Sequence, residues 1–135
     1  MTVLNSVHHI NFIVADLDVA VQAYQSKLGL GSFEYEELPD RGVSTARILI
    51  GGVWIILVSP RSKDSLAARY LEAHGEGFFL MSFGVDNLQQ AMAELARRGA
   101  LPKDRTARPG ILDWQVADLE TEQSLGVRFH LTQAD

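Results

Sequence analysis

Apolar residues in the first half of the chain recur with two spacings, one typical of strands and one typical of helices. Residues 7–15 (VHHINFIVA) form a short stretch rich in β-branched and aromatic side chains, which predicts a strand. Over residues 17–28 apolar positions recur at helical spacing, with Asp16 placed to cap the helix and Gly29 to end it. Further strands are predicted over residues 33–38, 43–50 and 53–58, and a connecting helix over residues 64–73.

The second half of the chain repeats this pattern. The segment HINFIVADLDVA, which starts at His9, aligns with LMSFGVDNLQQA, which starts at Leu80, at a constant offset of 71. GVWIILV (52–58) pairs with GVRFHLT (126–132) at an offset of 74. A helix over residues 87–98 and strands over residues 111–119 and 127–132 complete the second copy.

Two copies of about 70 residues are too few and too long for a solenoid. We therefore predict an α+β fold in which two βαβββ modules pair into one curved mixed sheet that encloses a cavity, with the helices on its outer face. The chain of 135 residues has the length of one domain. Within this domain, residues 7–58 form the first module, 59–76 the connector helix and 77–133 the second module.

Composition narrows the possible partners and chemistry. The 12 basic and 17 acidic residues give a net charge of −5, which offers no electrostatic basis for binding nucleic acid. The absence of cysteine excludes disulfides, thiolate metal ligands and a cysteine nucleophile. The first residues do not resemble a signal peptide, and no run of about 18 apolar residues occurs. We therefore expect a cytoplasmic protein with no membrane partner.

Four stretches of the chain carry a family resemblance. They are VHHINFIVADLDVAVQAYQSKLGL at the start, LAARYLEAHGEGFFLMSFGVDNLQQAMAELARRGA in the middle, and IILVSP and GVRFHLT at the ends of the two modules. Together they resemble the vicinal oxygen chelate superfamily, which includes glyoxalase I, bleomycin-resistance proteins, extradiol dioxygenases and methylmalonyl-CoA epimerase. The middle stretch looks most like the epimerase and glyoxalase branch, and the resemblance implies the two-module fold.

Metal-dependent members of that superfamily take one ligand from each of four strands. Carried over by position, these ligands fall on His9, Ile56, Leu80 and His130. A catalytic divalent metal typically needs three protein ligands with nitrogen, oxygen or sulfur donors, and Ile56 and Leu80 offer no lone pair. The resemblance therefore implies a degenerate metal site, and we expect no metal cofactor. The alternative is a divalent metal bound weakly by His9 and His130.

Side chains two apart share one face of a strand, so the cavity should be lined by the neighbours of these four positions. The candidate ligand-binding residues are Asn11, Trp54, Ile56, Leu80, Ser82, Arg128, Arg47 and Trp114. An apolar lining with a few polar groups suits a small organic ligand that has an aromatic or acyl part. Arg128 could meet a carboxylate or phosphate, and Arg47 could join it if its strand register faces inward.

Each candidate also has a structural interpretation. His9 and His130 could be packed histidines that hydrogen-bond neighbouring strands. Trp54 and Trp114 could fill the core or an interface. Arg128 could form a surface ion pair, because arginine is rarely buried without a partner.

Two further features are assigned no chemistry. His8 falls on the opposite face from His9 and is expected to be structural or exposed. The acidic stretch of Glu34, Glu36 and Glu37 is expected to be a solvated strand and turn edge.

These observations favour a protein that binds a small organic molecule in the sheet cavity without the superfamily's usual metal. The alternative is an isomerase or lyase of the epimerase or glyoxalase type. In it, His9 or His130 would act as general base next to a carbonyl, and Arg128 or Asn11 would stabilise the oxyanion. A third hypothesis keeps a weak metal completed by substrate. The residues leave open whether the chain is an enzyme. Superfamily members commonly pair, so we expect a homodimer.

Overall fold

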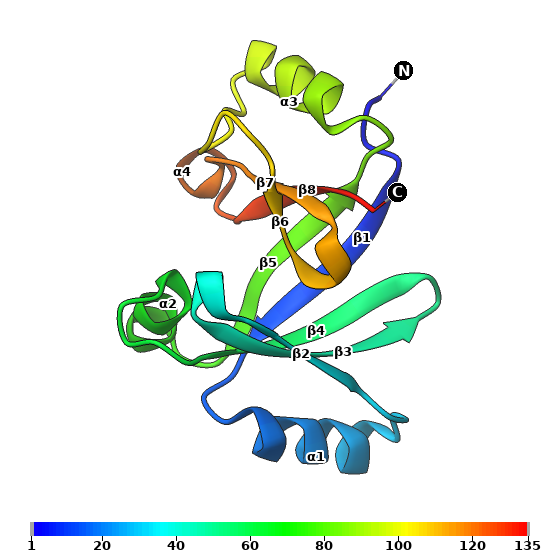
Figure 1. Cartoon of the computed structure of the whole chain (residues 1–135), viewed down its shortest axis with the longest axis vertical. Helices are drawn as coiled ribbons and strands as arrows, with labels where there is room; N and C mark the ends of the chain where they lie inside the picture. The colour runs from blue at the N-terminus through cyan, green and yellow to red at the C-terminus, as the bar shows by residue number, and fades with distance from the viewer. Residues whose placement is uncertain (1, 135) are drawn as a thin grey trace. The chain divides into compact units, whose positions relative to one another are not determined.

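The computed structural model describes residues 2–134 and confirms an α+β fold with one mixed sheet. Its strands are hydrogen-bonded in the order β2-β3-β4-β1-β5-β8-β7-β6 (Figure 1). Residues Ile10–Phe79 form one compact unit, called the first unit here, and the other described residues form the second unit. The boundary between the units falls inside β1 (Ser6–Ile13) and β5 (Gly77–Gly84).

The first unit contains three antiparallel strands, β2, β3 and β4, covered by a helix. Its elements are α1 (Leu17–Leu28), β2 (Glu34–Leu38), the 3₁₀ turn η1 (Pro39–Arg41), β3 (Val43–Ile50), β4 (Val53–Pro60) and α2 (Leu66–His74). The Asp16 carboxylate caps α1 by accepting from the Val19 amide at 3.1 Å, and Gly29 ends it in the left-handed conformation. The core beneath α1 contains Ala46 and Leu57 of the sheet.

The second unit also packs a helix on strands, and it contains the parallel pair of β5 and β8. Its elements are α3 (Leu88–Arg97), β6 (Arg108–Pro109), the 3₁₀ turn η2 (Ile111–Asp113), β7 (Gln115–Asp118), α4 (Glu122–Leu125) and β8 (Phe129–Gln133). β8 is parallel to β5 and antiparallel to β7. Leu88, Ala91 and Met92 of α3 pack against Ala117 and Leu131 of the sheet.

The faces predicted to lie under the helices do so in both units. Phe12 and Val14 belong to the core beneath α1, and Phe83 and Leu131 belong to the core of α3. Because side chains alternate across a strand, the neighbouring positions His130 and Ile56 face away from these cores. None of the described helices has the length and apolar character needed to cross a membrane.

The predicted strand over residues 111–119 is wrong at its start. Residues Ile111–Asp113 form η2, with Leu112 and Asp113 both at positive φ, and the strand begins only at Gln115. This tight turn connects β6 to β7. The two-residue β6 and the four-residue α4 were not predicted, because elements this short carry no apolar periodicity.

Candidate functional site

The second unit brings the two candidate histidines and Trp114 into one buried cluster. The imidazole of His9, which is 5% exposed, stacks on the indole of Trp114, which is 6% exposed. The ring centroids are 5.5 Å apart and the planes differ by 20°. Trp114 is the residue that directly follows η2, so the end of this turn positions the indole against His9. The aromatic wall of the cluster is therefore built by the turn between β6 and β7.

His8 does not lie apart from His9, contrary to the prediction from strand alternation. The Nδ1 atoms of the two imidazoles are 2.9 Å apart, so one donates a hydrogen bond and the other accepts it. The edge of the His8 ring also meets Trp114, with centroids 4.5 Å apart at 86°. His8 therefore belongs to the cluster and fixes the orientation of its neighbour.

His9 is uncharged at neutral pH. Burial lowers the pKa of its imidazole well below the ordinary value, and the positive charges of His8, His130 and Arg108 lower it further. A neutral imidazole keeps one N–H donor and one ring nitrogen acceptor. The site thus holds a histidine that can accept a proton or a hydrogen bond without first losing a charge.

The second candidate, His130, lies beside the carboxylate of Asp118, which in turn contacts Arg108. Its Nε2 atom lies 3.2 Å from Oδ1 of Asp118, an ion-pair contact that is not a well-aligned hydrogen bond. The same carboxylate oxygen accepts from Nη2 of Arg108 at 2.8 Å. Asp118 is the direct antiparallel partner of His130 between β7 and β8, so strand register produces the contact.

The sequence analysis missed Asp118 and Arg108. The strand predicted over residues 111–119 contains Asp118, but pairing it with His130 requires the true start of β7. Next along the same face, Ser82 and Thr132 share a buried hydrogen bond of 2.7 Å between their hydroxyls. The hydroxyl of Ser82 is therefore engaged within the unit rather than directed only at a ligand.

Arg128 already has an acidic partner. Its Nη2 atom lies 3.1 Å from Oε2 of Glu122 on α4, and its side chain is nearly buried. Arg128 thus forms the ion pair of the structural interpretation, with its own side chain nearly buried and that of Glu122 38% exposed. An incoming carboxylate would have to compete with Glu122 for this guanidinium.

In the first unit, Arg47 faces the same side of the sheet as Ile56, its direct partner across β3 and β4. The guanidinium is 4% exposed. It donates to Glu36 at 2.9 Å and to Glu34 at 3.1 Å, and its Cζ lies 5.6 Å from the ring centroid of Trp54. Its register thus places it on the side of Ile56, away from α1, and two carboxylates already balance its charge.

The expectation of a solvated acidic edge is borne out for Glu34, whose side chain is 70% exposed on the edge strand β2, but Glu34 and Glu36 also hold Arg47, a role that was not predicted. Alternation placed these two carboxylates on one face of β2, which is the signal that could have revealed them.

Asn11 of β1 is also in this unit. Among the described residues, its Oδ1 atom is buried without a hydrogen-bond partner.

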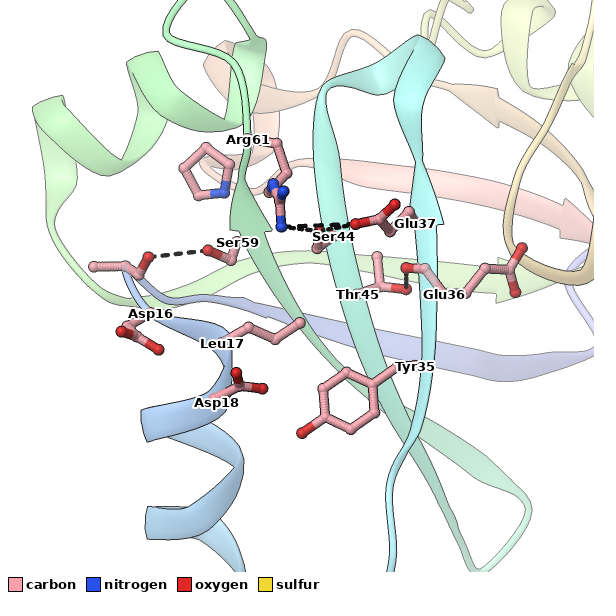
Figure 2. A pocket seen from close by; sticks show the side chains of 12 residues that line it. Asp16, Leu17, Asp18, Tyr35, Glu36, Glu37, Ser44, Thr45, Ser59 and Arg61 are labelled. Carbon is pink, nitrogen blue, oxygen red and sulfur yellow. Dashed lines mark hydrogen bonds and ion pairs between the residues drawn. The ribbon is translucent and has the colours of Figure 1, made fainter.

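The opposite face of the same sheet carries a cavity of about 400 Å³ at the start of α1 (Figure 2). Its lining includes Asp16, Asp18 and Glu37, none of which the sequence analysis assigned to a site. Ser59 donates to the Ala15 carbonyl at 2.9 Å. Arg61 lies 3.6 Å from Glu37, so this cation and this carboxylate are paired with each other.

The family described as Glyoxalase/Bleomycin resistance protein/Dioxygenase superfamily matches residues 8–117. The protein belongs to this superfamily. That membership confirms the resemblance drawn from the sequence.

Individual superfamily members are similar over most of the chain. Human mitochondrial methylmalonyl-CoA epimerase is 27% identical over 132 residues, which cover 97% of this chain and 75% of the human protein. The uncharacterized protein YqjC of Bacillus subtilis is 25% identical and is covered to 93%. The crystal structure of methylmalonyl-CoA epimerase from Mycobacterium tuberculosis has a TM-score of 0.93, 25% identity, and coverage of 100% of this chain and 91% of that one.

A solved methylmalonyl-CoA epimerase in complex with methylmalonyl-CoA and NH4+ is also similar, with a TM-score of 0.91, 25% identity, and coverage of 97% and 95%. Relatives of this protein in the superfamily thus bind small molecules. The fold and this relationship to epimerases are established for the chain.

The residues present do not fit the superfamily's four-ligand metal site. Ile56 and Leu80 occupy two of the four positions, and both are fully apolar and buried. Of the residues that the structure describes, no three His, Asp or Glu side chains gather as a metal would require. His130 at the last position is engaged with Asp118. We therefore derive no chemical step through a metal.

Proposed function

We propose that the protein binds a small organic molecule at the buried cluster of His9, Trp114 and His130 in the second unit, and does so without the superfamily's usual metal. The observation that carries the proposal is the stacking of an uncharged, buried His9 on Trp114. A flat aromatic wall beside a few fixed polar groups is typical of small-molecule sites. The apolar residues at two metal positions support the absence of a metal.

The chemistry of the cluster indicates what the ligand must offer. The indole of Trp114 favours an aromatic or acyl surface. The neutral His9 can accept from or donate to a carbonyl, hydroxyl or amide group. Arg108 and Asp118 are already paired with each other, so the cluster presents little free positive charge. A ligand with one or two polar atoms on an apolar body suits it better than a highly charged one.

Trp114 makes the proposal testable by fluorescence. The chain has two tryptophans, Trp54 and Trp114, so Trp54→Phe leaves the indole of the cluster as the only one. We expect a saturable change in its emission when an acyl-CoA, a hemithioacetal or a 2-oxo acid binds, and the same change in the presence of EDTA. The matched control is Trp114→Phe, in which Trp54 should report no change. A response that disappears with EDTA would contradict the proposal.

The second candidate function is that of an isomerase or lyase that moves a proton next to a carbonyl. The similarity to methylmalonyl-CoA epimerases favours it, and so does the presence of two buried imidazoles in one unit, His9 without charge and His130 beside a carboxylate. His9 or His130 would accept the proton as general base and return it to the same carbon.

Solvent exchange separates this function from simple binding. An enzyme should exchange the α-proton of an acyl-CoA, hemithioacetal or 2-oxo acid probe with deuterated water. His9→Ala or His130→Ala should abolish the exchange while far-UV circular dichroism stays unchanged. Exchange that persists in both variants would reject these histidines as the proton-transfer groups.

Homodimer formation and a cytoplasmic location are further parts of the proposal that derive from the sequence. Light scattering on the full chain should give twice the monomer mass. A single-chain mass across the micromolar range would reject the homodimer.

A further inference from the structure

Asp118 lies at the centre of the charged groups around His130. Its Oδ1 atom is 3.2 Å from His130 Nε2 and 2.8 Å from Arg108 Nη2. The side chains of Asp118 and His130 are both more than nine-tenths buried. The sequence analysis assigned a role to neither Asp118 nor Arg108.

A carboxylate oxygen 3.2 Å from Nε2, although not aligned as a hydrogen bond, biases electrostatically which ring nitrogen carries the proton. Neutral imidazole has one N–H and one lone pair, on either nitrogen. A lone pair on Nε2 would face the negative oxygen of Asp118 in a buried, weakly screened setting, whereas an N–H there would be attracted to it. The carboxylate therefore favours the tautomer with its hydrogen on Nε2.

We infer that Asp118, anchored by Arg108, is a positioning residue that holds His130 in the Nε2–H tautomer and leaves Nδ1 as the acceptor of the ring. This inference rests on the proposed function in giving His130 a ligand-contacting role. His130 then meets a ligand group that has a hydrogen to give: a hydroxyl, an amide N–H, or a C–H made acidic by a neighbouring carbonyl.

Arg108 anchors Asp118 in this arrangement. β6 pairs with β7 so that Arg108 is the strand partner of Val116, two residues before Asp118 on the same face. From there its guanidinium reaches the carboxylate and draws it into one position. The short β6, which apolar periodicity did not reveal, thus has a role in orienting His130.

The test is the tautomer of His130, measured by long-range ¹H–¹⁵N correlation on the full chain near pH 8.5, about two units above the ordinary pKa of histidine. The chain has four histidines, so the His130→Gln variant assigns the signal. We expect Nε2 at the shift of a protonated nitrogen and Nδ1 at that of an unprotonated one. A wild-type His130 that carries its hydrogen on Nδ1 overturns the inference.

Variants test whether Asp118 causes the tautomer preference of His130. Asp118→Ala should abolish the preference for the Nε2–H tautomer. The double variant Arg108→Met with Asp118→Ala should do the same without leaving a buried cation, and it decides the matter if the single variant does not fold. Glu120→Gln, which removes an exposed carboxylate two residues away, should leave the tautomer unchanged. Retention of the Nε2–H tautomer in the double variant would refute the role of Asp118.

This experiment needs no ligand, so its failure differs from the failure of the proposed function. A tautomer as inferred, combined with no response of Trp114 to any probe, rejects only the binding proposal. A Trp114 response combined with the opposite tautomer rejects only the role of Asp118.

Discussion

Acidification should destabilise the folded protein through His9. Burial lowers the pKa of this imidazole well below its ordinary value, and the charges of His8, His130 and Arg108 lower it further. In the unfolded chain a histidine titrates at about pH 6.5. Below that pH the unfolded state binds a proton that folded His9 does not bind, so the free energy of unfolding falls as the pH falls.

The size of this loss in the free energy of unfolding follows from the one proton that the unfolded chain binds at His9. For a group with an unfolded pKa of about 6.5 and a folded pKa below the range studied, the loss between pH 7.5 and 5.5 is about 1.4 kcal/mol. The loss begins near the unfolded pKa and continues down to the lowered pKa of folded His9. The stability is fully present above this window.

Urea unfolding at pH 7.5, 6.5 and 5.5 measures this loss. His9→Asn removes the titrating group, so its loss on acidification should be smaller than that of the wild type, by up to about 1.4 kcal/mol. His74→Asn is the matched control, because His74 is exposed at the end of α2 and should keep the wild-type dependence. An identical pH dependence in His9→Asn and the wild type would refute the claim that folded His9 resists protonation.

Three other substitutions test the burial of Trp114, the ion pairs of Arg47 and the cap of α1. Trp114→Ala should lower the free energy of unfolding by about 3–5 kcal/mol, measured by urea unfolding, because a buried indole is lost; a loss under about 1 kcal/mol would contradict its burial. Arg47→Met should cost about 2 kcal/mol, less than a fully buried pair, since its partner Glu34 is exposed and can hydrate. The added change Glu36→Gln should recover part of that loss, and no recovery would argue against the pair. Asp16→Ala should cost about 1 kcal/mol by removing the cap of α1, and an unchanged melting temperature would reject the cap.

Much of the architecture could be predicted from the sequence because apolar spacing records burial. The repeat between the segments at His9 and Leu80 predicted two modules, and alternation placed His130 and Ile56 on the faces away from the helices. The same alternation places Glu34 and Glu36, the two partners of Arg47, on one face of β2, because they are two residues apart.

The details of the site were harder to predict because they depend on turns and register. Trp114 reaches His9 only through η2, where Leu112 adopts a left-handed conformation that is uncommon for leucine and that the apolar pattern does not indicate. The contact of His8 with His9 arises from side-chain torsions, which strand alternation does not describe. Asp118 becomes the neighbour of His130 only once the start of β7 is known.

Native mass spectrometry of the purified full chain tests the central claim most directly, because it detects a retained metal and a retained organic molecule in one spectrum. Metal-independent binding predicts a protein that carries no stoichiometric metal after incubation with micromolar Zn²⁺, Ni²⁺, Mn²⁺ or Fe²⁺. It also predicts that the wild type retains a small organic adduct and that the Trp114→Ala variant loses it. One tightly held metal ion per chain, lost in the His9→Ala and His130→Ala variants, would contradict it.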